Sequence, residues 1–199
     1  MTAKKIYVLV ESHYDPTEAP AFEMFFPACG YEVEFISDLR GASSRTFMDN
    51  DGLNSVEVTT DLEDANLDDA TGLILIGGYA MNMLRYQVHV VVESSNEPRS
   101  TQFLRKAMGK ANFIIGTICH ALWLFTPAPD LLKNRQVTCS HNIMFDVQNT
   151  GAELVYNRST NMLVDVHVDG NLVTARHPYV VQAFMNTFLE ELNKVHSMA

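Results

Sequence analysis

The amino-acid sequence predicts an α/β fold, in which helices cover both faces of an open, mostly parallel β-sheet. Residues 6–10, 72–78 and 112–118 are short apolar runs, too short for helices and typical of strands that are buried on both faces. Segments with a helical spacing of apolar residues separate these runs. A strand, a helix and a strand in succession form the unit of a parallel sheet with right-handed crossovers.

Composition limits the size and class of the protein. The 199 residues, 47% of them hydrophobic, suit a single domain spanning residues 1–199. The formal net charge of -10 argues against nucleic acid and anionic membranes as partners, because both need a basic surface. No apolar run approaches the length that spans a bilayer. The run before Glu11 has five apolar residues and predicts a first strand rather than a signal peptide.

The three cysteines, Cys29, Cys119 and Cys139, are sparse, odd in number and without the spacing of metal ligands. They predict reduced thiols in a cytoplasmic protein. No pair of histidines or carboxylates has ligand spacing on a clear helix face. We therefore expect neither a metal site nor a cofactor.

The first elements follow one another closely. After the strand at 6–10, a helix is expected from Glu18 to about residue 28, because a carboxylate in the first turn is favoured by the helix dipole. Gly30 is a typical helix terminator. Residues 31–37 alternate between polar and apolar side chains and predict a second strand.

The middle of the chain mixes turns with periodic segments. Residues 38–69 contain turn signals around one short strand at 55–59. The apolar run 72–78 ends in two glycines, which let the backbone bend sharply and expose an N–H group. Helical spacing extends over 79–93, although this segment is rich in valine, and again over 98–109.

The last part begins with the strand at 112–118, after which the apolar residues 121–125 predict a helix packed under the sheet. Asp169-Gly170 is a strong hairpin signal. It predicts a small β-hairpin near the C-terminus. The further predicted elements are a short strand at 136–139, a helix at 142–149, strands at 162–168 and 172–175, and a helix at about 178–196.

Cys119-His120 follows the strand 112–118 directly, as in a nucleophile elbow, where the reactive side chain sits on a sharp strand-to-helix turn. A helix terminus and a neighbouring imidazole both favour the reactive thiolate. The alternative is a buried structural cysteine, since free cysteine packs as a small hydrophobe. Ligands bind at the carboxyl ends of strands in such sheets, where Glu18, the Gly77-Gly78 pair and Cys119 would meet. This convergence favours the catalytic interpretation.

Several motifs together resemble a known family. In order and spacing they are similar to the ThiJ/PfpI superfamily, the flavodoxin-like relatives of class I glutamine amidotransferases, and within it to the PfpI-like branch of intracellular protease or deglycase-type proteins. The resemblance covers nearly the whole chain. It implies a doubly wound, mostly parallel sheet sandwiched by helices. The motifs are Leu73-Ile-Leu-Ile-Gly-Gly78, Ile118-Cys-His-Ala-Leu-Trp-Leu124 and residues 134–138, 146–152 and 168–178.

The resemblance also implies roles for single residues. Cys119 corresponds to the family's nucleophile, His120 to the neighbouring base, and Glu18 to a buried, protonated carboxyl partner of the sulfur. The N–H groups of Gly78 and His120 would form the oxyanion hole. A homodimer, or a higher homo-oligomer, is implied as well, with a neighbouring subunit able to orient the histidine.

The chain departs from the family pattern at several positions. Ala121 replaces the glycine that follows the Cys-His pair, which crowds the turn. Val180 stands where the branch has an aspartate, and Ile76 where the family has a proline. Residues 156–161 resemble an insertion, for which a role in a pocket or an interface is open.

Substrate contacts are expected from residues around the turn. We assign them to Gly77, Tyr79, His13, His141 and Ala121. For His13, a surface loop position and a place at the pocket rim are both open. His141 follows a strand whose end should approach the site, which makes it a candidate second base.

Three functions remain open at this point. The first is a cofactor-independent enzyme in which the Cys119 thiolate attacks a small reactive carbonyl, as in glyoxalases and deglycases, or an amide. The second is a redox sensor or chaperone-like protein whose cysteine is oxidised to sulfinic acid. The third is a hydratase or lyase of a specialised metabolite such as an isocyanide. All three place a small molecule or an oxidant at Cys119.

Overall fold

The computed structural model describes residues 4–197, so the ends of the predicted domain 1–199 lie outside the described residues. Within this range the centre is a seven-stranded sheet in the order β12-β13-β7-β6-β1-β2-β5. All neighbouring strands in it are parallel except β12 and β13. The predicted α/β fold class is therefore confirmed. The strands are β1 (Lys5–Leu9), β2 (Glu32–Ser37), β5 (Thr60–Asp61), β6 (Gly72–Leu75), β7 (Ile114–Ile118), β12 (Val166–Asp169) and β13 (Leu172–Ala175).

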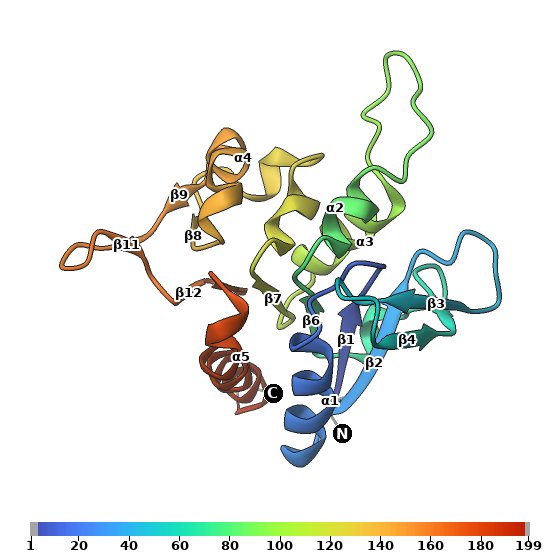
Figure 1. The fold of residues 1–199 in the computed structure, drawn as a ribbon, viewed down its shortest axis with the longest axis horizontal. Helices are drawn as coiled ribbons and strands as arrows, with labels where there is room; N and C mark the ends of the chain where they lie inside the picture. The colour runs from blue at the N-terminus through green and yellow to red at the C-terminus, as the bar shows by residue number, and fades with distance from the viewer. Residues whose placement is uncertain (1–3, 198–199) are drawn as a thin grey trace.

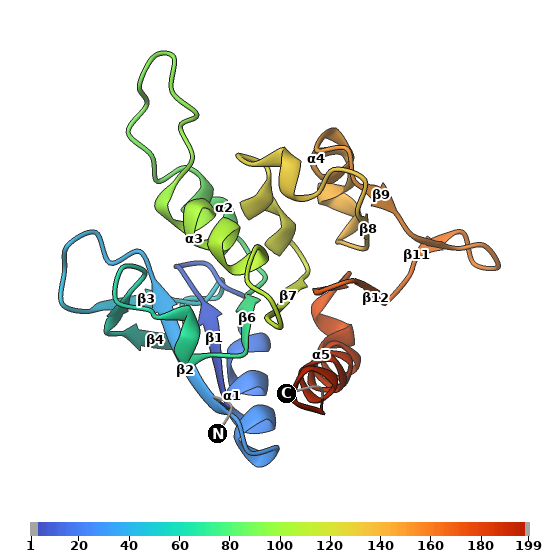
Figure 2. The same ribbon diagram turned by 180° about the vertical axis from the view of Figure 1, so that it is seen from behind.

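Helices cover both faces of this sheet (Figure 1). On one face lie α1 (Glu18–Ala28) and α5 (Val181–Ser197), and on the other α2 (Ala80–Arg85) and α3 (Arg99–Met108). The view from behind shows the same layers, with α4 (Met144–Asn149) beyond the β7 side of the sheet (Figure 2). Because β6 and β7 lie between both layers, every residue in them is buried.

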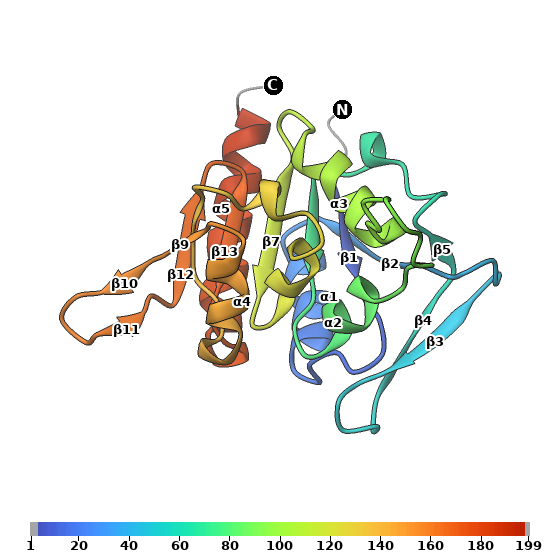
Figure 3. The ribbon, with the colours of Figure 1, turned by 90° about the horizontal axis from the view of Figure 1, so that it is seen from above.

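Three small two-stranded sheets stand outside the main one. A hairpin joins β3 (Arg45–Met48) to β4 (Ser55–Val58), and β8 (Gln136–Val137) pairs in parallel with β9 (Glu153–Leu154). A second hairpin, β10 (Tyr156–Asn157) with β11 (Met162–Leu163), projects from the body of the molecule (Figure 3). We call residues 156–163 the arm. It contains the segment that the sequence marks as an insertion.

Two predicted elements are shorter than expected. The helix predicted over 79–93 ends at Arg85, and its valine-rich part forms a loop in which Val90, Val91 and Val92 are exposed. Valine loses side-chain freedom in a helix. A helical spacing of valines therefore does not form a helix when these side chains have no surface to pack against. The strand predicted from residue 112 begins at Ile114, because Asn112 has a left-handed backbone.

Other elements are divided or were not predicted. Residues 45–48 form β3, which the turn signals around it concealed. The predicted strand 162–168 is split into β11 and β12, and the strand at 136–139 shrinks to β8. Short 3₁₀ turns begin the predicted helices at 142 and 178. The 3₁₀ turns are η1 (Leu67–Asp69), η2 (Ala121–Phe125), η3 (Pro129–Leu131), η4 (His141–Ile143) and η5 (Pro178–Val180).

The hairpin near the C-terminus is present, and it borders the site. Asp169 pairs with Leu172, so two residues connect β12 to β13. Parallel pairing then aligns β13 with β7 until Ala175 lies opposite Ile118. This register brings the ends of both strands to the same edge of the sheet, directly before Cys119.

Candidate active site

Cys119 lies where β7 ends and the chain turns. Its φ is +59°, a left-handed backbone that is uncommon for a residue with a side chain. Main-chain hydrogen bonds hold it on both sides: the Cys119 N–H donates to Ala175 O at 2.9 Å, and the Ser140 N–H donates to Cys119 O at 3.2 Å. The side chain is 7% exposed. The sulfur is thus held rigidly at the carboxyl edge of the sheet, with little access to solvent.

The segment after Cys119 differs from the expected helix. Residues 121–125 form the 3₁₀ turn η2, which is too short for the dipole of a regular α-helix. The sequence argument that a helix terminus stabilises the thiolate therefore loses its basis. Ala121 is fully buried.

Glu18 approaches the same place from the first turn of α1. It is 0% exposed, and its Oε2 accepts a hydrogen bond of 2.6 Å from the Gly77 N–H. Its Oε1 is buried and has no hydrogen-bond partner within residues 4–197. An unpartnered carboxylate oxygen in an apolar interior is costly, which favours the neutral acid.

Gly77 separates Glu18 from Cys119. A Cβ atom at this position would lie 2.5 Å from Glu18 Oε1 and 2.8 Å from Cys119 Cβ. Both side chains therefore border the space that the missing side chain leaves. The sequence reasoning expected a glycine pair for its bend, and the close approach of an acid and a thiol is a second reason for Gly77.

We expect Gly77→Ala to destabilise the protein by about 1–3 kcal/mol, because the added methyl group overpacks this contact. Urea unfolding of the two proteins measures the difference. Gly109→Ala is the matched control, since a Cβ there would meet its neighbours at 3.6 Å and beyond. Equal losses in both variants would contradict the predicted steric conflict.

Gly78 has a left-handed backbone and packs against the main chain of His13. Its φ is +70°, and a Cβ there would lie 2.4 Å from His13 O. The Tyr79 N–H donates to the same His13 oxygen at 2.6 Å. The main chain of His13, whose own φ is +68°, thus holds the loop that carries Gly78 in place. The backbone N–H of Gly78 lowers the pKa of the Cys119 thiol and opposes the lowering of the pKa of His120.

The charge state of Glu18 follows from its surroundings. Burial raises the pKa of the Glu18 carboxyl well above its ordinary value, and the nearby charge of Asp15 raises it further, whereas the bond from Gly77 opposes the shift. The acid is neutral in the folded protein at a pH where it is ionised in the unfolded chain.

This shift predicts a pH dependence of stability. Because the folded-state pKa is raised, the folded protein binds more protons than the unfolded chain above the ordinary carboxyl pKa, so the contribution of Glu18 to stability is lost as the pH rises through that window. Glu18→Gln cannot titrate. We expect urea unfolding to show the wild type losing stability relative to Glu18→Gln between pH 4.5 and 8, whereas a pH-independent difference would contradict the raised pKa.

Ser140 contacts the sulfur from the other side. Its hydroxyl lies 3.3 Å from Cys119 Sγ and 2.7 Å from Arg176 O. Burial raises the pKa of the Cys119 thiol to about 11, with a further increase from any charge on Glu18, while Ser140 and Gly78 act in the opposite direction. The resting sulfur is therefore a thiol at neutral pH, contrary to the thiolate that the sequence argument favoured.

His120 points into an aromatic cluster. Its ring centroid lies 4.8 Å from that of Trp123 and 5.5 Å from that of Tyr79. Its Nε2 is 3.0 Å from Asn142 Oδ1, whereas its buried Nδ1 has no partner within residues 4–197. Burial lowers the pKa of His120, although the bond to Asn142 opposes this, so the imidazole is neutral at pH 7. No hydrogen bond in the described part of the chain joins it to Cys119.

Trp123 is half-buried beside His120. Its Nε1–H donates to Asp146 Oδ2 at 2.6 Å. Ser140, Asn142 and Asp146 are contacts that the sequence reasoning did not name. Their signal was weak, because all three follow the short strand β8, where only His141 carried recognisable chemistry.

The remaining predicted contacts are dispersed. Tyr79 is 47% exposed above the cluster, and His141 is exposed on η4. Gly77 and Ala121 are buried, so any role for them in substrate binding passes through the backbone or the shape of the turn. The substrate contacts that the sequence suggests stay predictions.

Family membership follows from a direct comparison. Residues 4–191 match the model of the DJ-1/PfpI family. The chain belongs to the DJ-1/PfpI family. This confirms the resemblance that the sequence motifs indicated.

Individual relatives match most of the chain. General stress protein 18 of Bacillus subtilis is 27% identical over 191 residues, which are 96% of this chain and 99% of the relative. Protein/nucleic acid deglycase 2 of Escherichia coli is 29% identical over 92% of this chain and 94% of its own. A ThiJ/PfpI domain protein from Brachyspira murdochii shares the fold, with a TM-score of 0.78 at 18% identity, covering 98% of this chain and 99% of that one.

Among residues 4–197, no three histidine, cysteine or carboxylate side chains gather as metal ligands. Within the same residues, no helix combines the length and the apolar character needed to cross a membrane.

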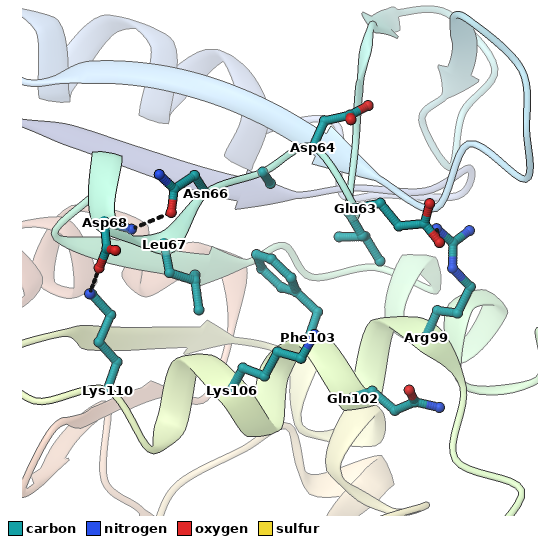
Figure 4. A pocket seen from close by; sticks show the side chains of 12 residues that line it. Glu63, Asp64, Asn66, Leu67, Asp68, Arg99, Gln102, Phe103, Lys106 and Lys110 are labelled. Atoms are coloured by element: carbon teal, nitrogen blue, oxygen red, sulfur yellow. Dashed lines mark hydrogen bonds and ion pairs between the residues drawn. The ribbon is translucent and has the colours of Figure 1, made fainter.

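A cavity of about 880 Å³ lies apart from Cys119, between α3 and residues 62–68 (Figure 4). Phe103 and Leu67 face each other across it, and charges of both signs line its rim. There Lys110 pairs with Asp68, and Arg99 with Glu63. Since none of its lining residues belongs to the Cys119 cluster, we assign it no ligand.

Proposed function

We propose that the protein is a cofactor-independent enzyme in which Cys119 attacks the aldehyde of a small α-oxoaldehyde such as methylglyoxal, or an adduct of that aldehyde on an amino or thiol group. The observation that carries this proposal is the position of Cys119, whose backbone has a φ of +59°, beside the fully buried, neutral carboxyl group of Glu18. Such a strand-end turn is a nucleophile elbow in function, and the acid supplies a proton donor next to the nucleophile.

The first step joins the sulfur to the aldehyde carbon. As the C–S bond forms, His120 takes the thiol proton and the carbonyl oxygen becomes negative; that proton then passes to the oxygen. We assign the N–H groups of Gly78 and His120 to the stabilisation of this oxygen. The product is a hemithioacetal, which needs no leaving group.

The second step moves a proton between carbons. The hydrogen on the former aldehyde carbon leaves as a proton, the neighbouring ketone carbon receives one, and the hemithioacetal becomes a thioester of a 2-hydroxy acid. Water then cleaves the thioester and restores the thiol. The sum is an α-oxoaldehyde plus water giving a 2-hydroxy acid, without external oxidant or reductant. Glu18 and His120 are the groups that we assign to the proton transfers.

The high pKa of the thiol suits this chemistry better than a sensor. Peroxide oxidation proceeds through the thiolate, which is scarce at neutral pH when the pKa of Cys119 is about 11. Attack on an aldehyde also consumes thiolate, but there the thiolate is formed only transiently, as His120 takes the proton while the C–S bond forms. The name deglycase on a relative 29% identical supports the same class of substrate.

The experiment that tests the proposal measures aldehyde loss and acid formation. The full chain is incubated with methylglyoxal and, separately, with its adduct on N-acetylarginine, and lactate is quantified. We expect lactate in stoichiometric yield, with a rate unchanged by EDTA. Unchanged aldehyde and adduct, together with hydrolysis of a peptide amide, would favour the protease-like alternative and contradict the proposal.

The homodimer implied by the family resemblance stays a prediction. Sedimentation velocity of the full chain measures its mass in solution, and a monomer at micromolar concentration would contradict this prediction.

A further inference from the structure

A second cavity, of about 340 Å³, lies next to the Cys119 cluster, between the arm and the start of α4. We call it the arm cavity. We infer that the arm cavity binds an apolar substituent of the substrate that reacts at Cys119, so that the preferred α-oxoaldehyde carries an aromatic or branched group in place of a methyl group. This inference rests on the proposed function and specifies its substrate class.

Ser140 connects the cavity to the sulfur. Its hydroxyl lies 3.3 Å from Cys119 Sγ, and the same residue lines the cavity. Cys139, the preceding residue, lines it as well. Ser140 thus borders both the reacting atom and the cavity, which places the cavity within reach of a substituent on the attacked carbonyl.

The lining of the cavity is suited to an apolar group. Its apolar lining consists of Met144 on α4 and the arm residues Tyr156, Met162 and Leu163. Tyr156 and Met162 remain 45% and 53% exposed, so apolar surface stays in contact with water while the cavity has no ligand. A planar aromatic ring would cover this surface and could pack against Tyr156.

Charged and polar groups at the cavity are partly engaged. Arg176 Nε donates to Asp165 Oδ1 at 2.6 Å, and His177 Nδ1 accepts from the Tyr179 N–H at 3.2 Å. His141, also in the lining, is the residue for which the sequence suggested a substrate contact. These contacts leave the thioether and aliphatic side chains as the larger part of the free surface.

The arm forms one wall of this cavity. Residues 156–161 stand out in the sequence as an insertion, and the hairpin that contains them supplies one wall. A methyl substituent, as in methylglyoxal, would leave that wall uncovered. A larger apolar substituent gains binding in a pocket of matching shape, typically tenfold or more in kcat/KM.

The first test compares kcat/KM for phenylglyoxal and methylglyoxal. We expect the wild type to prefer phenylglyoxal by about tenfold or more. Met144→Trp fills the cavity and should reduce that preference by about tenfold. Met24→Trp, at an exposed position on α1, is the matched control and should keep the preference. A wild type without preference, together with an unaltered ratio in Met144→Trp, would overturn the inference while leaving the proposed function intact.

The second test does not depend on aldehyde turnover. Cys119 is alkylated with iodoacetamide and with its aromatic counterpart iodoacetanilide, and the labelled peptide is quantified by mass spectrometry, which separates it from the exposed Cys29. Met144→Trp should slow the aromatic reagent relative to the small one, and circular dichroism verifies the fold. If both glyoxals are inert but this selectivity is lost in Met144→Trp, the proposed function fails and the cavity assignment stands. Equal relative rates in all proteins would overturn the cavity assignment.

Discussion

Cys119→Ser is expected to lower kcat/KM for methylglyoxal by at least about a thousandfold while the fold is retained. The hydroxyl group is a far weaker nucleophile than sulfur, and it has no activating base within hydrogen-bond distance except Ser140, itself a hydroxyl. The backbone of Cys119 is held by main-chain bonds that serine can also make. Lactate formation measures the rate, and thermal unfolding verifies that the variant is folded.

The control for this variant is Cys29→Ser. Cys29 is exposed and follows the end of α1, so its replacement should leave the rate unchanged. A folded Cys119→Ser variant with wild-type activity would falsify the assignment of the nucleophile. Loss of activity in Cys29→Ser alone would also contradict it.

Glu18→Gln is expected to reduce kcat by about a hundredfold or more, with a smaller change in KM. Glutamine has the same shape as the neutral acid, and its carbonyl oxygen can accept the Gly77 N–H in place of Oε2. It cannot, however, give up and regain a proton during the reaction. A proton-transfer role therefore predicts a loss in kcat without a loss of the fold, measured by steady-state kinetics.

The matched control on the same helix is Glu23→Gln, which removes an exposed carboxylate. It should change neither kcat nor the pH dependence of stability. If Glu18→Gln kept full kcat, Glu18 would serve packing alone. The alkylation rate of Cys119 in this variant distinguishes the two roles, because a proton donor to the sulfur alters thiolate formation whereas a packing residue does not.

Much of the fold could be predicted from the sequence because the main strands are buried on both faces. Such strands have continuous apolar runs, and the runs at 72–78 and 112–118 contain β6 and β7. A glycine pair at the end of a strand, or a nucleophilic residue directly after one, is also recognisable from the local sequence. That is why Glu18, Gly77 and Cys119 could be placed at one edge of the sheet before any coordinates were known.

The rest of the site depends on contacts that no local pattern encodes. Ser140 and Asn142 reach Cys119 and His120 from a segment outside the main sheet. The pKa of the thiol depends on burial, which outweighs the neighbouring donors and which sequence cannot measure. The turn after Cys119 is a 3₁₀ segment because its apolar side chains are packed from several sides, and propensity alone does not distinguish it from an α-helix.

The hydroxyl of Ser140 has one proton and two neighbours able to accept it, the carbonyl of Arg176 and the sulfur. A resting thiol can donate its own hydrogen to the serine oxygen, which leaves the serine proton on the carbonyl. A sulfur anion has no hydrogen to give and attracts the serine proton instead. Each ionisation of Cys119 therefore competes with the hydrogen bond between Ser140 and the main chain that leaves β13, so the charge on the sulfur and the anchoring of Ser140 are coupled.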